Sequence, residues 1–211
     1  MSPKLPRTPP ADLARRRPLW KDWEPNQPLW HVANSKGAYA ARFAVMRSYG
    51  PLPSARFDPH PPPPGLHPTE RVLYAASNLV AALAERFQKG REIRRHQPDE
   101  PVVYAWTPTR TLRLLDLTGR AATRLGASHT ISAGPKDVTR SWARALRATW
   151  PTADGLFYSS AMTGEPCFAL WAPAQNSFPA APAFSALLSH PATSWNNLLR
   201  AAAAQIGYDL P

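Results

Sequence analysis

Three polar residues in separate segments carry side chains that could act together on an anionic substrate. Arg56 stands in Ser-Ala-Arg-Phe-Asp, Glu85 in Ala-Leu-Ala-Glu-Arg, and Ser160 follows Phe-Tyr-Ser. A guanidinium binds a phosphate through two parallel hydrogen bonds and keeps its charge. A carboxylate stabilises positive charge developing on a sugar, and a hydroxyl can donate to a phosphate or ribose oxygen. We therefore expect the three to converge in one polar cleft.

Glu85 is expected on a helix that follows a strand. Residues 72–76 are rich in β-branched, aromatic and apolar side chains and predict the strand. In the next segment Leu79, Leu83 and Phe87 recur at every fourth position, which predicts a helix with a buried apolar stripe. Glu85 lies off this stripe, so its carboxylate is available to a neighbouring cavity.

The remaining pattern mixes strands and helices without a regular βαβ alternation. Further strands are expected at residues 30–33, 102–107, 112–117, 156–159 and 167–171, and helices at 137–150, with Asp137 as N-cap, and at 193–206, ended by Gly207. The class expected from this order is α+β, a single domain of small packed β-sheets with flanking helices. The chain lacks the glycine fingerprint of a Rossmann dinucleotide site.

The 211 residues are enough for one domain with a sizeable core. Residues 1–27 are basic and proline-rich and predict a flexible or surface-bound arm. Residues 28–178 are expected to form the functional core, with residues 179–211 as a C-terminal helical segment packed on it.

Cysteine and histidine usage limits the kinds of site. The single Cys167 excludes an internal disulfide, and the six histidines lack the spacing of a metal site, so no metal is expected. The sequence shows no apolar run of about 18 residues and no secretory signal. We therefore expect a soluble, cytoplasmic protein without a membrane partner.

The formal net charge of +11 is carried mainly by residues 1–150. On the expected helix 137–150, Arg140, Arg144 and Arg147 should face outward, as a solvated face or as a contact for a partner. The positive electrostatic field of residues 1–150 suits an anionic dinucleotide, a nucleic acid or an acidic protein as binding partner. No nucleic-acid-binding motif is present, so direct nucleic-acid binding is the weaker alternative.

The segments around the three polar residues resemble the RES domain family, named for an Arg, a Glu and a Ser. The resemblance runs from about Pro28 to Pro173. It rests on four short segments, which are Arg56-Phe57, Tyr74-Ala75-Ala76, Ala82-Leu83-Ala84-Glu85 and Phe157-Tyr158-Ser159-Ser160. The chain departs from the family where Ser54 and Ala55 replace glycines and where His31 stands in place of a frequent arginine.

The resemblance implies a bacterial NAD-degrading toxin with an ADP-ribosyltransferase-like fold. Arg56, Glu85 and Ser160 would be catalytic, and Arg56, Phe57, Tyr74 and His31 would bind NAD. The implied reaction is NAD phosphorolysis, with inorganic phosphate as co-substrate, and transfer of ADP-ribose to a protein is the related alternative. A cognate antitoxin of the Xre, helix-turn-helix type is the implied partner. A non-enzymatic relative that serves as an interaction module is a further alternative.

Overall fold

One eight-stranded sheet organises the computed structural model, which describes residues 5–38 and 40–211. The strand order is β1-β7-β8-β9-β5-β2-β6-β10. The sheet strands are β1 (Trp20–Trp23), β2 (Leu29–Asn34), β5 (Val72–Ala76), β6 (Pro101–Trp106), β7 (Leu112–Asp116), β8 (Gly155–Ser159), β9 (Pro166–Trp171) and β10 (Phe184–Leu187). A separate two-stranded pair consists of β3 (Tyr49–Gly50) and β4 (Gly65–Leu66).

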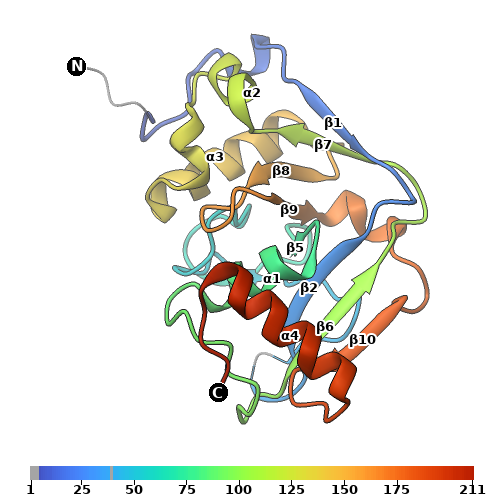
Figure 1. The fold of residues 1–211 in the computed structure, drawn as a ribbon. Helices are drawn as coiled ribbons and strands as arrows, with labels where there is room; N and C mark the ends of the chain where they lie inside the picture. Colours follow the sequence, from blue (N-terminus) through green and yellow to red (C-terminus); the bar gives the residue numbers. More distant parts are fainter. Residues whose placement is uncertain (1–4, 39) are drawn as a thin grey trace.

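Four α-helices are found in the described residues, and they lie in two groups (Figure 1). They are α1 (Leu79–Phe87), α2 (Gly119–Arg124), α3 (Lys136–Thr149) and α4 (Thr193–Ile206), with 3-10 helices at Leu13–Arg15, His129–Ser132 and Ala172–Ser177. Helices α2 and α3 lie near β7 and β8, whereas α1 and α4 lie together near β2 and β6. Strands β7 and β8 are parallel, and α2 and α3 supply the crossover that a parallel pair requires.

The expected α+β class and single domain are confirmed. The strands, however, join into one large sheet rather than several small packed sheets, because β5 pairs with β2 on one side and with β9 on the other. Part of the expected arm also belongs to the sheet, since β1 pairs with β7 and Trp23 packs on Phe168 at a ring distance of 4.7 Å. The division into arm, core and C-terminal segment remains a prediction.

The local signals in the sequence locate most elements. Asn78 caps α1 by accepting a 2.8 Å hydrogen bond from the Ala81 amide, and Gly207 ends α4 in the left-handed conformation, with φ of 67°. The expectation that Asp137 is the N-cap of α3 is wrong. Pro135 holds the cap position of α3, and Asp137 lies in the first turn, where it pairs with Arg7 at 2.6 Å.

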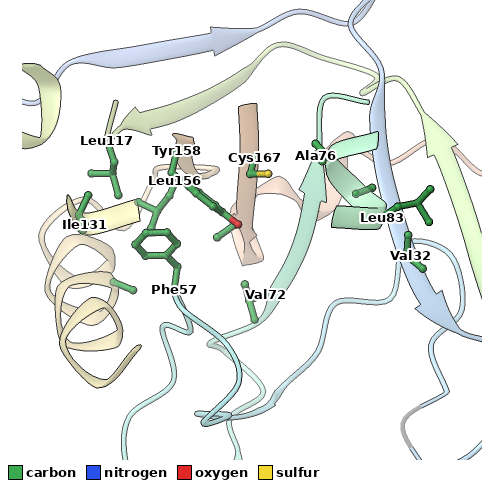
Figure 2. Close-up of a cluster of buried hydrophobic side chains, with 14 of the residues drawn as sticks. Val32, Phe57, Val72, Ala76, Leu83, Leu117, Ile131, Leu156, Tyr158 and Cys167 are labelled. Atoms are coloured by element: carbon green, nitrogen blue, oxygen red, sulfur yellow. The ribbon is translucent and has the colours of Figure 1, made fainter. Parts of the chain in front are cut away.

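The two faces of the sheet bury separate apolar clusters. One cluster contains Leu83 of α1 and Trp142 of α3, and the other contains Trp106 and Phe168. Figure 2 shows the first cluster, in which the ring of Phe57 enters from a loop and lies against Tyr158 at 4.6 Å. Phe57 is fully buried, so it fixes the backbone of its neighbour Arg56.

None of the described helices has the length and apolar character that spanning a membrane requires. In the same described ranges, no three His, Cys, Asp or Glu side chains converge as metal ligands.

Candidate functional site

A cavity of about 630 Å³ lies between α1, β2, β5 and the loop that precedes Phe57. Four of the six predicted site residues line it, namely His31, Arg56, Tyr74 and Glu85. The other two, Phe57 and Ser160, are buried behind its wall. The fold therefore brings residues from four distant segments to one place.

Glu85 and Ser160 are joined directly. Ser160 Oγ donates a 2.6 Å hydrogen bond to Glu85 Oε1 and accepts hydrogen bonds from the amides of Met162 and Thr163, at 3.0 and 3.1 Å. The hydroxyl has one proton, which it donates to the Glu85 carboxylate. This corrects the expectation that Ser160 donates to a phosphate or ribose oxygen, because its contact is with Glu85.

Lys89 follows Glu85 by four positions, the spacing of a common surface ion pair on a helix, but the geometry does not support such a pair. No ion pair joins the two among the described residues. Apart from Ser160, the one side-chain hydrogen bond to the Glu85 carboxylate within the described residues comes from Gln88, whose Nε2 lies 3.4 Å from Oε2. The Ser160 hydrogen bond fixes Oε1, while Oε2 has just the long contact to Gln88 within the described residues, which leaves that oxygen suited to facing a ligand.

Arg56 is held from both its side chain and its backbone. Its guanidinium donates to the Gly134 carbonyl, and its own carbonyl accepts a 2.8 Å hydrogen bond from Thr139 Oγ1. Buried Phe57 anchors the next position. Since Nη1 makes the contact to Gly134, the other guanidinium donors remain available to an anion in the cavity.

The hydroxyl of Tyr74 belongs to a buried network that sequence reasoning missed. It donates to Asp58 Oδ1 at 2.8 Å and accepts from the Phe57 amide at 3.0 Å. Arg47 and the Leu52 amide also bond to Asp58, at 2.5 and 2.8 Å. Tyr74 lines the cavity, so its ring remains available to a bound ligand while its hydroxyl orders the loop.

Asp58 is fully buried and is the centre of this network. Burial by itself raises the pKa of the carboxyl, but the His60 ring, whose Nδ1 lies 3.7 Å from Oδ2, and the hydrogen-bonded charge of Arg47 outweigh it and hold the pKa well below the usual range. The sequence contained one signal, because an acidic residue beside Arg56-Phe57 in an apolar, proline-rich segment must find partners when it is buried.

His31 is held as a neutral ring. Its Nδ1 lies 2.7 Å from the Tyr74 carbonyl, which can only accept, so Nδ1 carries the proton. The pKa of His31 is lowered to about 4, chiefly by burial; the hydrogen bond to the Tyr74 carbonyl opposes this shift, and the nearby charge of Arg86 adds to it. Nε2 makes no hydrogen bond to a described residue and is an acceptor, so His31 does not supply the charge of the arginine that is frequent at this position in the RES family.

Arg140 and Arg147 do not lie on a solvated face of α3, which was one of the two expected alternatives. Arg140 donates to the carbonyls of Leu52, Pro53 and Ala55, at 3.2, 3.2 and 3.1 Å. Arg147 pairs with Glu70 at 3.2 Å. Helix α3 therefore holds the loop 52–55, which forms part of the cavity wall.

A comparison of the sequence with known protein families identifies the family of this chain. The RES domain model matches residues 28–195. This chain belongs to the RES domain family. Among solved structures, it is similar to a chain in the crystal structure of the M. tuberculosis MbcT-MbcA toxin-antitoxin complex, with a TM-score of 0.61 and 17% identity over 92% of this chain and 98% of that one. At 17% identity, the similarity shows that the two chains share a fold. No curated protein matches the RES protein.

Proposed function

We propose that this RES protein cleaves the bond between nicotinamide and ribose in NAD. The observation that carries the proposal is the Glu85 carboxylate, fixed by Ser160 in a cavity whose other charged lining groups are cationic. A volume of about 630 Å³ falls within the usual range for a small-molecule site. Membership of a family of NAD-degrading toxins supports the same substrate.

Each residue then has a chemical role. As the bond from ribose C1″ to the nicotinamide nitrogen breaks, its electron pair leaves with the pyridine ring and positive charge develops on the sugar. Glu85 stabilises that charge and accepts a hydrogen bond from a ribose hydroxyl. Ser160 positions Glu85, and Arg56 binds a phosphate group. The ring of Tyr74 stacks on a base, and Nε2 of His31 accepts a hydrogen bond from the substrate.

The acceptor in the proposal is inorganic phosphate. An oxygen of phosphate forms the new bond to C1″, giving nicotinamide and ADP-ribose 1″-phosphate. The cations of the cavity favour an anionic acceptor over water, since they raise its local concentration. Transfer of ADP-ribose to a protein is the competing outcome, and it would use the same Glu85.

The proposal includes an antitoxin that keeps the enzyme inactive. The solved structure of similar fold is a toxin-antitoxin complex. By the family resemblance the antitoxin would be of the Xre, helix-turn-helix type and would cover the cavity. The proposed location is the cytoplasm, where NAD and such a partner would be available.

The deciding experiment follows NAD by chromatography with purified protein, with and without phosphate. NAD loss that depends on phosphate and yields the phosphorylated product is expected. Glu85→Gln keeps the size of the side chain and an oxygen that can accept from Ser160 but removes the charge, so it should lower the rate by about 10² or more. Undiminished turnover in this variant would remove Glu85 from the mechanism. Phosphate-independent labelling of a protein would favour ADP-ribosyl transfer instead.

The rival nucleic-acid function gives a different result in a second measurement. Binding to a nucleic-acid backbone falls steeply as salt rises, because it releases counterions. Turnover of NAD should persist at moderate salt. Salt-sensitive nucleic-acid binding without any NAD loss would support the rival.

A further inference from the structure

Arg56 and Lys136 both line the cavity, and neither pairs with a carboxylate among the described residues. The other arginines of the cavity wall differ in this respect. Arg47 is neutralised by buried Asp58, and Arg86 lies 3.7 Å from Asp99. Two partly buried positive charges in one cavity therefore lack a protein counterion.

Direct contacts hold Arg56 next to Lys136. The Arg56 guanidinium donates to the carbonyl of Gly134, two residues before Lys136. The hydroxyl of Thr139 lies 2.8 Å from the Arg56 carbonyl and 3.2 Å from the Lys136 carbonyl. The start of α3 and the segment of Arg56 are thus joined by two hydrogen bonds, and the side chains of Arg56 and Lys136 line the same cavity.

The electrostatics at Lys136 agree with this geometry. Burial lowers the pKa of the ammonium, and the neighbouring charges of Arg56 and Arg140 lower it further, whereas Glu85 opposes them. Like charges at close range destabilise one another unless an anion lies between them. Glu85, the one carboxylate that lines the cavity within the described residues, makes its 2.6 Å contact with Ser160 instead.

We propose that Arg56 and Lys136 together form a phosphate-binding subsite in the cavity that contains Glu85. The inference rests on the proposed NAD cleavage and deepens it. The ligand is a phosphate group, supplied by free inorganic phosphate or by the pyrophosphate of the dinucleotide. The planar fork of Arg56 fixes the orientation of the group, while the Lys136 ammonium adds a point charge and three donors.

The first test measures NAD turnover by Lys136→Gln while phosphate and NAD are varied separately at constant ionic strength. Loss of a hydrogen bond to a charged group should raise one Michaelis constant about tenfold or more. An increase in KM for phosphate assigns the subsite to the acceptor, and an increase in KM for NAD assigns it to the pyrophosphate. Lys136→Arg should retain most of the wild-type value. Lys36→Gln removes an equal charge at the surface, where Lys36 pairs with Glu100 at 2.8 Å, and should change neither constant.

The second test does not depend on turnover. Titration calorimetry with inorganic phosphate and with inorganic pyrophosphate should show binding to the wild type and to Lys136→Arg, and about tenfold weaker binding to Lys136→Gln. Equal binding by all three proteins, or unchanged Michaelis constants in Lys136→Gln with an active wild type, would overturn the subsite. A wild type that consumes no NAD yet binds phosphate through Lys136 would instead refute the proposed function and leave the subsite intact.

Discussion

Ser160 Oγ lies 2.6 Å from Glu85 Oε1, although 75 positions separate the two residues in the sequence. The amides of Met162 and Thr163 occupy the lone pairs of the same hydroxyl, so its proton can point only at the carboxylate. With 5% of its surface exposed, Ser160 contacts Glu85 rather than the cavity, so in the proposed reaction it would act by positioning that carboxylate.

Replacing Ser160 with alanine should lower kcat for NAD cleavage and leave KM for NAD within about twofold. The carboxylate loses its fixed orientation, and misplacement of a reacting group costs roughly tenfold to a hundredfold in rate. Ser160→Thr keeps the hydroxyl and should restore most of kcat. Ser159→Ala removes the same atom from the neighbouring residue and serves as the control. A Ser160→Ala enzyme with normal kcat would show that the bond to Glu85 has no role in the reaction.

Removing the Tyr74 hydroxyl should destabilise the fold. Tyr74→Phe keeps the ring but leaves Asp58 Oδ1 and the Phe57 amide each without one partner in a buried setting. The expected cost is about 1–3 kcal/mol in the free energy of unfolding, measured by urea denaturation. Tyr104→Phe is the matched control, because the Tyr104 hydroxyl makes no hydrogen bond within the described residues and should change stability little. Equal effects of the two variants would contradict the network around Asp58.

His31 should make the stability of the protein depend on pH. Burial lowers the pKa of the folded ring from 6.5 to about 4, so between these values the unfolded chain binds a proton that the folded chain does not. The free energy of unfolding is therefore not reduced by His31 above pH 6.5. It falls as the pH drops from 6.5 to about 4, by at most about 3 kcal/mol.

Urea unfolding at several pH values within this window would measure the effect. His31→Gln should flatten the curve, since glutamine does not titrate. Asp58 does not interfere, because its depressed pKa means that its stabilisation is lost only below about pH 4. An equal slope in His31→Gln would show that other groups cause the dependence.

Arg140 should control the affinity for substrate through the loop 52–55. Arg140→Gln removes the guanidinium contacts to Leu52, Pro53 and Ala55, so the wall of the cavity becomes less ordered. KM for NAD should rise roughly fivefold or more, as expected for the loss of a net hydrogen bond or two. Arg144→Gln, one turn further along α3, is the control, since Arg144 makes no hydrogen bond to a described residue. Similar KM values in both variants would refute this role.

Much of the fold could be predicted because its signals are local. The stripe of Leu79, Leu83 and Phe87 is buried as expected, and Asn78 caps the helix that carries Glu85. Strand β5 covers the predicted residues 72–76. The edge strands β1 and β10 were missed. They are short, and their place comes from pairing with β7 and β6 rather than from their own composition.

The sequence by itself determined which chemical groups the protein has, which helix and strand carry Glu85 and Tyr74, and the family to which the chain belongs. Periodicity, caps and short motifs depend on residues a few positions apart, so they are readable without the fold. Only the tertiary structure decided that the Ser160 proton points to Glu85, that Asp58 binds Tyr74, and that Lys136 and Arg56 line one cavity. Such pairings depend on which donor and acceptor are brought together when distant segments bury their apolar faces, and no local pattern encodes that choice.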